Sequence, residues 1–473
     1  MSLYGSLVRN VTMPLALWRR GESGLLRYLR EFEATQFLPA EELRRLQWQR
    51  CRDLLAHAHA QCPFYRQAFE RIGAEPGDFS QLEDLRALPP LEKADIQQHG
   101  ADLVAQNWPA DDLIRNQTGG STGTPIRFYL SNDRKLSRAA ATLRHNRWAG
   151  WEIGDRAAVI WGAPRDKPGS NWRARLHGLL FREPMWLDTG CLTESDMERF
   201  RLALNRQRPR VIQAYAGSAV LFARWLEAVG RPVHAPVGLV TSAEVLEDES
   251  RALLERVFRC PVFNRYGCRE VSVIASECEA HQGLHVMAEG LYVEIETPTG
   301  AARPGEVGSI LVTDLLNHAM PLIRYRIGDL GSWAAGACAC GRQLPRLEKV
   351  AGRVTDFLVG ADGRLVSGVF LATYVVAQRP SLGQVQIQQD QPGAVSYLVC
   401  PGTGFDTDAD MAYLHRATEQ HLGAGATCAV NLVSELPRSA SGKFLFSRSR
   451  VTPAFLTGSS GGKAPVDMKT GRT

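Results

Sequence analysis

Glycine and hydroxyl residues crowd one short segment of the chain, 117–125, whose sequence is QTGGSTGTP. Glycine lets the backbone approach a ligand closely and adopt positive φ, so that several N–H groups and hydroxyls can surround phosphate oxygens. The segment lacks the Gly-Lys-Ser/Thr ending of a Walker loop. It therefore indicates a phosphate-binding loop of another kind, although clusters of this composition also form plain surface turns.

Five further motifs follow in order along the chain, and each combines a charged side chain with small residues. They are TSAE at 241–244, YGCRE at 266–270, YRIGD at 325–329, GRVTD at 352–356 and PRSASGK at 437–443. Taken alone, any of them is a weak signal, and GRVTD or SGK is also typical of an ordinary turn. In this order, and together with the glycine-rich loop, the set resembles the adenylate-forming superfamily of acyl-CoA ligases and adenylation domains.

Within that superfamily, the chain from about residue 45 to 450 is similar to the phenylacetate-CoA ligase and CapK-type branch. The likeness is carried by CPFYRQAF, LPPLEKADI, SECEAHQGLHV, AMPLIRYRIGDL and CACGRQLPRLEKVAGRVTDFLV. After the last of these, GADGRLVSGVFL differs from the stretch expected of phenylacetate-CoA ligases. This difference favours the CapK-like side and leaves the identity of the acid open.

The resemblance implies an AMP-forming acid–thiol ligase. With ATP and Mg²⁺, such an enzyme activates a carboxylic acid as its acyl-adenylate, releases pyrophosphate and then transfers the acyl group to coenzyme A. Attack of the carboxylate on the α-phosphate requires alignment and neutralisation of charge rather than a side-chain nucleophile. Transfer to an amine or to a carrier-protein thiol stays open, and so does a non-catalytic nucleotide-binding scaffold.

The resemblance also implies roles for individual residues. Lys443 and Glu270 are the expected catalytic residues, because Lys443 would reach the carboxylate and the α-phosphate and Glu270 would hold Mg²⁺, a hard cation that prefers oxygen ligands. Tyr266 would pack against adenine, Asp329 would accept the two ribose hydroxyls, and Asp356 would be the hinge of a mobile domain. The full set of expected nucleotide- and substrate-binding residues is Thr118, Ser121, Thr122, Gly123, Thr124, Ser242, Ala243, Glu244, Tyr266, Gly267, Asp329, Arg353 and Asp356.

Cysteine and histidine residues form two pairs about sixty residues apart. Cys338 and Cys340 are spaced for a tight turn, and Cys278 precedes both His281 and His285. Two such pairs of soft ligands predict a closed structural Zn²⁺ site. Likeness to the phenylacetate-CoA ligase-like proteins that carry such a zinc, and the Gly-Leu-His context, favour His285 over His281. Because Cys-x-Cys is tighter than the usual ligand spacing, reduced buried thiols remain the alternative.

The elements that must position these residues indicate an α/β fold. Short β-rich runs at 156–162, 210–215, 237–242 and 260–267 alternate with helical stretches such as 218–230, which predicts parallel strands. From about residue 290 the runs LYVEIET, GSILVT and PLIRYR follow one another closely and predict a β-rich subdomain.

Three domain-level segments follow from this pattern and from the resemblance. We expect a large N-terminal adenylate-forming domain over 1–352 with mixed sheets, including a β-rich, zinc-binding subdomain at about 275–350. A small, mobile α+β domain should cover 353–455. The tail 456–473 is rich in Gly, Ser and Lys, buries almost nothing and should be disordered.

Length and charge limit the remaining classes. At 473 residues the chain exceeds the roughly 250–300 residues of a single core. The net charge is +5, from 55 basic and 50 acidic residues, and the basic residues form no stripe of the kind typical of nucleic-acid binders. No nucleic-acid partner is therefore expected. The N-terminus lacks the apolar core of a signal peptide and no stretch reaches the ~20 apolar residues of a transmembrane segment, so we expect a cytoplasmic location. The arginines and leucines of the N-terminus leave contact with a membrane surface open.

The expected small-molecule partners are a carboxylic acid and coenzyme A or another acyl acceptor, and the sequence leaves a homodimer open. Aromatic residues gather between about 145 and 245, which favours an aryl or otherwise apolar acid, unless they belong to the core. They are Trp148, Trp151, Trp161, Trp172, Trp186 and Tyr215.

Overall fold

A computed structural model describes residues 3–117, 126–161, 184–188, 194–353, 357–363, 365–367, 371–376, 379–436 and 447–451. The chain forms two compact units, of which the larger comprises Met1–Thr297 and Ala301–Arg353 and the smaller is built around Val354–Leu436. The expected mobility of the smaller unit stays a prediction.

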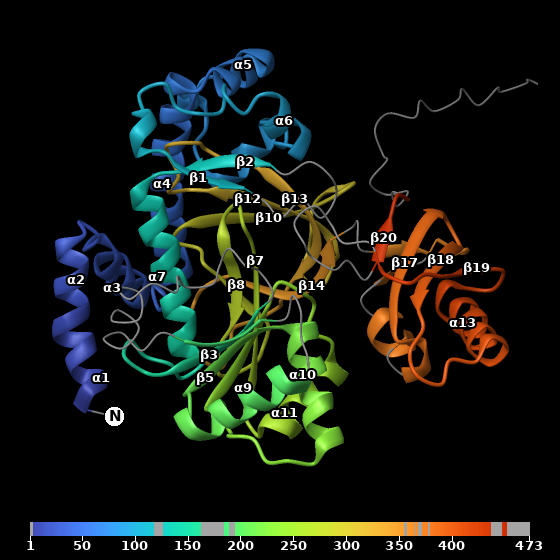
Figure 1. Ribbon diagram of the computed structural model, residues 1–473. Coiled ribbons are helices and arrows are strands. Elements are labelled where there is room, and N and C mark those ends of the chain that lie inside the picture. The colour runs from blue at the N-terminus through green and yellow to red at the C-terminus, as the bar shows by residue number, and fades with distance from the viewer. Residues whose placement is uncertain are drawn as a thin grey trace, which may run out of the picture. The chain divides into compact units, whose positions relative to one another are not determined.

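The larger unit is built on a twelve-stranded sheet (Figure 1). Its strands are β3 (Ala157–Trp161), β4 (Met185–Asp188), β5 (Val211–Tyr215), β6 (Gly238–Ser242), β7 (Val262–Cys268), β8 (Ser272–Glu277), β9 (Leu284–Val286), β10 (Leu291–Thr297), β11 (Gly300–Ala301), β12 (Gly308–Asp314), β13 (Tyr325–Trp333) and β14 (Arg346–Arg353). Their order is β11-β10-β12-β13-β14-β9-β8-β7-β6-β5-β3-β4. Pairing is parallel from β4 to β7 and antiparallel from β7 through β8, β9, β14, β13 and β12 to β10. The β-rich part therefore continues the parallel sheet.

The helices of the larger unit pack around this sheet. They are α1 (Leu3–Leu7), the π-helical η1 (Val8–Thr12), α2 (Met13–Arg19), α3 (Gly24–Thr35), α4 (Ala40–Gln61), α5 (Pro63–Ile72), α6 (Lys93–Gln98), α7 (Asn132–Trp148), α9 (Glu194–Gln207), α10 (Ala216–Val229) and α11 (Asp248–Phe258), with short 3₁₀ turns at Pro76–Asp78, Leu82–Ala87 and Ala110–Asp112. A hairpin of β1 (Ile114–Gln117) and β2 (Arg127–Leu130) precedes α7. In the described part of the chain, no helix combines the length and the apolar character needed to cross a membrane.

The predicted parallel strands β3, β5, β6 and β7 are confirmed, and helices cover both of their faces. Leu239 and Val262 pack with the side chains of α9, α10 and α11 on one face. Val240 and Phe263, whose side chains point to the opposite face, pack with Ala149 just after α7. Burial on both sides explains why these runs are almost continuously apolar in the sequence.

One predicted strand begins later than expected. The run PLIRYR starts at Pro321, but β13 begins only at Tyr325. Arg324 has φ 52°, in the left-handed region, which interrupts the extended backbone. Its buried guanidinium donates to Glu294 (3.1 Å) and to the carbonyl of Leu88 (2.6 Å), and these bonds hold the unusual backbone in place.

The smaller unit contains a four-stranded sheet in the order β19-β18-β17-β20. Its elements are β15 (Phe357–Val359), β16 (Leu365–Ser367), the π-helical η7 (Leu371–Val376), the 3₁₀ turn η8 (Pro380–Leu382), β17 (Gln384–Gln391), β18 (Ala394–Cys400), α13 (Thr407–Leu422), β19 (Thr427–Leu432) and β20 (Ser447–Ser449). Leu414 and Leu422 of α13 pack with Ile387 and Tyr397 of the sheet in one apolar core. Helix and sheet occur together in this unit, in agreement with the predicted fold class.

A fully buried ion pair joins α7 to the turn before β10. Arg144 donates to Glu289 through both terminal nitrogens, at 2.5 and 2.9 Å, and also to the carbonyl of Phe32 at 2.7 Å. Thr35 donates a further bond to Glu289 at 2.8 Å. Two buried charges compensated in this way are costly to separate.

We expect Glu289→Gln to lower the free energy of unfolding by about 3–5 kcal/mol, because Arg144 would keep its charge without a buried counter-charge. Chemical denaturation measures this loss. Glu227→Gln is the matched control: it breaks the exposed pair with Arg256 and should cost no more than about 1 kcal/mol. Equal losses in the two variants would contradict this view of the core.

Candidate active site and metal centre

Several predicted residues lie at the carboxyl ends of the parallel strands, the edge where open α/β sheets bind ligands. Ser242 ends β6 and is paired with Tyr215 at the end of β5. Trp161 ends β3, and its ring stacks on that of Tyr215 with centroids 3.9 Å apart. Trp148, expected near the same site, instead lies beside the ring of His285 at 5.8 Å.

The backbone just after β6 is strained. Ala243 has φ 69°, which is uncommon for a residue with a Cβ and occurs where the surroundings impose it. The next residue, Glu244, accepts a hydrogen bond from the backbone N–H of Gly217 at 2.5 Å. A Cβ on Gly217 would lie 2.9 Å from that carboxylate, so a larger residue there would displace the Glu244 side chain. The strained turn thereby directs Glu244 toward the start of α10.

Two tyrosine–carboxylate hydrogen bonds link the β7–β8 hairpin to β13, in opposite directions. Tyr266 of β7 donates to Asp329 of β13 at 2.7 Å. Tyr325 of β13 donates to Glu270, in the turn after β7, at 2.9 Å. Both carboxylates are at least 95% buried. Each side thus supplies a tyrosine to the other side's acid, which brings the predicted ribose-binding and magnesium-binding carboxylates into one network.

These bonds require a strongly curved sheet. Four steps separate β7 from β13 in the strand order, and in a flat sheet they would lie about 19 Å apart. The β7–β8, β12–β13 and β13–β14 pairings all contain register shifts, which bend and twist strands. The curvature visible in Figure 1 therefore brings the two halves of the site together.

Two arginines of α7 hold the turn that carries Glu270. Arg138 donates to the carbonyls of Arg269 and Glu270, at 2.6 and 3.4 Å. Arg134 donates to the carbonyl of Val271 at 3.0 Å. Burial, followed by the nearby charge of Arg134, lowers the pKa of Arg138 to about 10, so it remains a cation at neutral pH. Three successive carbonyls are therefore fixed by guanidinium groups, which sets the position of the Glu270 side chain.

Glu270 also has capacity for another ligand. Its Oε2 atom is buried and has no hydrogen-bond partner among the residues that the structure describes. A buried carboxylate oxygen without a donor is unfavourable unless a cation or a ligand donor compensates it. The neighbouring Cys268 supplies only a weak S–H donor: burial, and then the negative charge of Glu270, raise the pKa of its thiol well above the usual range. Cys268 therefore stays a neutral thiol.

Gly267 is required where β7 and β8 are closest. A Cβ at this position would lie 2.2 Å from the carbonyl oxygen of Ser272. No side chain fits at that distance, so the predicted Tyr-Gly pair of the YGCRE motif has a steric cause. Gly267 thereby allows β7 and β8 to approach closely at the turn that carries Glu270.

The four predicted soft ligands come together in the larger unit. Cys278 follows β8, His285 lies on β9, and Cys338 and Cys340 lie between β13 and β14. Their ligand atoms all lie within 4.8 Å of one another. The sulfurs of Cys278 and Cys338 are 3.7 Å apart. Two sulfurs bound at 2.3 Å to a tetrahedral zinc would lie about 3.8 Å apart, so the spacing suits such an ion.

His285 is oriented toward this cluster by its backbone contact. Its Nδ1–H donates to the carbonyl of Leu344 at 3.3 Å, because a carbonyl can only accept. The lone pair of Nε2 then faces the sulfur of Cys340, at 3.3 Å. His281 lies elsewhere, 3.4 Å from the carboxylate of Glu277. The structure thus brings His285, and not His281, to the three cysteines.

Other predicted residues lie outside the described part of the chain. They are Thr118, Ser121, Thr122, Gly123, Thr124, Trp172, Asp356, Lys443 and the tail 456–473. Arg353 is described only in its backbone, which pairs with Asp329 across β13 and β14.

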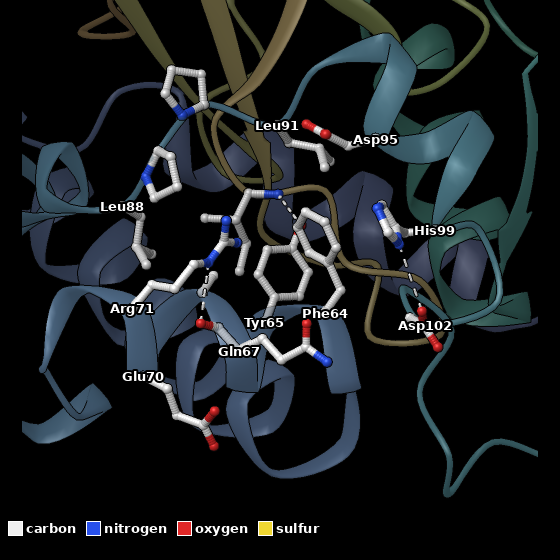
Figure 2. Close-up of a pocket in the computed structure, with 14 residues that line it drawn as sticks. Phe64, Tyr65, Gln67, Glu70, Arg71, Leu88, Leu91, Asp95, His99 and Asp102 are labelled. Carbon is white, nitrogen blue, oxygen red and sulfur yellow. Dashed lines mark hydrogen bonds and ion pairs between the residues drawn. The ribbon is translucent and has the colours of Figure 1, made fainter.

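A separate pocket of about 680 Å³ lies beside α5 and α6 (Figure 2). No predicted site residue lines it. Its wall residue Leu91 is connected to the site through the backbone, since it hydrogen-bonds to Arg324 and Arg326 on either side of Tyr325. Three carboxylates, those of Glu70, Asp95 and Asp102, and one guanidinium, that of Arg71, line the pocket, so its lining is acidic overall.

Three residues of the site were not identified from the sequence. Tyr325 belongs to the YRIGD motif, but the motif assigns it no function. Arg134 and Arg138 lie outside every motif. The spacing of four between the two arginines shows only that they share a helix face. Their carbonyl partners lie more than 130 residues away.

The chain is similar to phenylacetate-coenzyme A ligases. It is 30% identical to that of Thermus thermophilus over 334 residues, which are 68% of this chain and 73% of that protein. It is also 30% identical to the Escherichia coli K12 protein over 330 residues, 67% of this chain and 73% of that protein. Protein CapK of Staphylococcus aureus is 23% identical over 456 residues, 90% of this chain and 94% of CapK. No family model matches the chain.

Solved structures share its fold. The chain aligns with 2-hydroxyisobutyryl-CoA ligase in the postadenylation state, in complex with 2-HIB-AMP, with a TM-score of 0.69, covering 88% of this chain and 91% of that one. The same ligase in the thioesterification state, with 2-HIB-AMP and CoA, gives 0.61, covering 88% and 92%. The identities are 20% and 19%, so these likenesses concern the fold alone. They confirm the predicted fold class.

We expect Tyr325→Phe to lower the free energy of unfolding by about 1–3 kcal/mol, because the buried Glu270 would lose the hydroxyl that donates to it. Denaturant titration followed by tryptophan fluorescence measures the change. Tyr292→Phe is the matched control, since Tyr292 as a residue is only 9% exposed and its hydroxyl makes no hydrogen bond to the described residues. If both variants were as stable as the wild type, the bond to Glu270 would carry little energy.

Proposed function

Because the chain belongs to the phenylacetate-coenzyme A ligase family of adenylate-forming enzymes, we propose that it activates an aryl or other apolar carboxylic acid with ATP and Mg²⁺ and transfers the acyl group to coenzyme A. The resemblance predicted from the sequence motifs is confirmed by these relatives. The chain is an AMP-forming acid–CoA ligase. The class of acid, the metal and the roles of single residues are the proposal.

The observation that supports the proposed chemistry most directly is the network of Tyr266, Asp329, Tyr325 and Glu270. Glu270 would hold Mg²⁺ on the triphosphate, because its Oε2 is buried and lacks a donor among the described residues. Asp329 would accept the ribose hydroxyls, and the Tyr266 ring would pack against adenine. A metal bound to phosphate oxygens neutralises charge that develops as pyrophosphate leaves.

The remaining steps of this proposal fall to residues whose roles come from the resemblance. The loop with Ser121 and Thr124 would hold the β- and γ-phosphates. Lys443 would contact the carboxylate and the α-phosphate, where a compact ammonium group on a flexible stem suits both partners. A turn of the smaller unit about Asp356 would let one site serve adenylation and then thioester formation.

An apolar acid is supported by the strand ends beside this network. The stacked rings of Trp161 and Tyr215 form an aromatic surface at the same edge as Ser242, Ala243 and Glu244. An aryl or alkyl group could pack on that surface while its carboxylate is directed toward the nucleotide. A strongly polar acid would lose hydration there without hydrogen bonds in return.

Zinc is the proposed ion for Cys278, His285, Cys338 and Cys340. Three thiolates and one imidazole are a usual donor set for a closed structural site. The site would link the end of β8, β9 and the β13–β14 connection. It would thereby stabilise β13, which carries Asp329, and β8, which follows the turn with Glu270. It would take no part in the reaction itself.

The first test is pyrophosphate release with ATP, Mg²⁺ and a panel of aryl and fatty acids, with and without coenzyme A. We expect release that depends on the acid, and a thioester product when coenzyme A is present. Lys443→Ala should lower the rate by about 100-fold or more. Glu270→Gln should raise the Mg²⁺ concentration for half-maximal rate by about tenfold.

The outcomes separate the alternatives. Acid-dependent release without a thioester would favour an amine or a carrier-protein thiol as the acceptor. No release with any acid, together with no binding of ATP, would contradict the proposal and favour a non-catalytic scaffold.

For the metal site, we expect one zinc per chain by elemental analysis of the purified protein. The double variant Cys338→Ser/Cys340→Ser should lose the zinc and more than about 2 kcal/mol of unfolding free energy. The control variant Cys400→Ser, in the smaller unit, should keep the zinc and the wild-type free energy of unfolding. A wild-type protein that is stable and free of metal would contradict the zinc assignment.

A further inference from the structure

Large apolar side chains are exposed along one side of the N-terminal helical segment formed by α1, η1 and α2 (Figure 1, dark blue). The exposed fractions are highest at its ends, 93% for Leu3 and 70% for Trp18. Between them lie Leu7 (49%), Val11 (53%) and Leu15 (53%). Successive members are three or four residues apart, so they share one side of the helix. We call this row the N-terminal stripe.

The segment is packed on the larger unit by its other side. Val8 and Leu17 are at least 95% buried in the main apolar core. Gly5 lies against Gly154 so closely that a Cβ on Gly154 would be 2.7 Å from the Gly5 carbonyl oxygen. Packing of the buried side therefore fixes the orientation of the helical segment and leaves the stripe exposed.

The segment is also basic. Between Leu3 and Gly21 the sequence contains three arginines and no acidic residue. Arg9 lies 3.7 Å from Glu152 and is compensated. Arg19 and Arg20, next to Trp18 at the end of the stripe, are exposed and make no ion pair with any residue that the structure describes. A cationic, aromatic end thus adjoins an aliphatic row.

Acidic residues close to this end are already paired. Glu22 accepts from Lys135 at 2.6 Å. Asp133 accepts from Arg27 at 3.4 Å and from the hydroxyl of Tyr28 at 2.6 Å. Arg19 and Arg20 therefore have no compensating carboxylate among the described residues and are available to an external anion.

We propose that the N-terminal stripe docks the protein on an anionic phospholipid surface. Leu7, Val11 and Leu15 would enter the boundary between headgroups and acyl chains, where apolar side chains of an interfacial helix insert. Trp18 has the amphipathic ring that favours this depth. Arg19 and Arg20 would contact lipid phosphates, each contributing attraction to the negative surface.

Charge favours this partner over a second copy of the chain. If two stripes packed against each other, neither segment would offer a carboxylate to the arginines of the other, because residues 3–21 contain none. Like charges would then be brought together or left uncompensated. A surface of lipid phosphates provides the anions and the apolar phase at once.

The test is flotation of the full chain with vesicles of phosphatidylcholine alone or mixed with phosphatidylglycerol. We expect binding to the anionic vesicles that weakens as salt is raised. Arg19→Gln/Arg20→Gln should weaken it by about 30-fold. Leu7→Ser/Leu15→Ser should weaken it by about tenfold or more.

Val307→Ser is the matched control, since Val307 is 57% exposed but lies outside the stripe, and it should bind like the wild type. Unchanged thioester formation from a soluble acid would show that each variant is folded. Absence of binding to anionic vesicles, or equal binding of all variants, would overturn the proposal. A dimer in analytical ultracentrifugation that Leu7→Ser/Leu15→Ser dissociates, with no vesicle binding, would assign the stripe to a second copy instead.

Discussion

Two hydrogen bonds between tyrosines and buried carboxylates hold the candidate site together. Tyr266 and Asp329, and Tyr325 and Glu270, connect strands that a flat sheet would keep far apart. A carboxylate removed from water needs donors, so each acid stabilises the curved arrangement that brings its tyrosine within reach. The curvature of the sheet and the position of the acids are thus parts of one constraint.

Helix α7 carries much of the support for this constraint. Its first turns present Arg134 and Arg138 to the carbonyls around Glu270, its C-terminal half carries the Arg144–Glu289 ion pair, and Trp148 at its end lies beside His285. The turn of the site, the core and the metal-ligand cluster therefore depend on a single rigid element. Such a helix can hold functional groups more closely than a loop could.

The electrostatics suit a reaction in which charge must be neutralised. Glu270 is positioned by the fixed backbone of its turn and by the hydrogen bond from Tyr325. Its other carboxylate oxygen has no hydrogen-bond partner among the described residues. An acid that is preorganised in this way would bind the proposed Mg²⁺ without first rearranging. The thiol of Cys268 is kept neutral beside it, first by burial and then by the negative charge of Glu270.

The sequence by itself determined the α/β class, the parallel strands β3, β5, β6 and β7, and the family, because local apolar patterns and short motifs are properties of neighbouring residues. It also pointed to Cys278, His285, Cys338 and Cys340 from ligand type and spacing. Only the tertiary structure decided that Tyr325 donates to Glu270 and that Arg138 holds its turn, because these partners are 55 and more than 130 residues apart. Such contacts depend on how far the sheet curves, and neither periodicity nor a motif records that curvature.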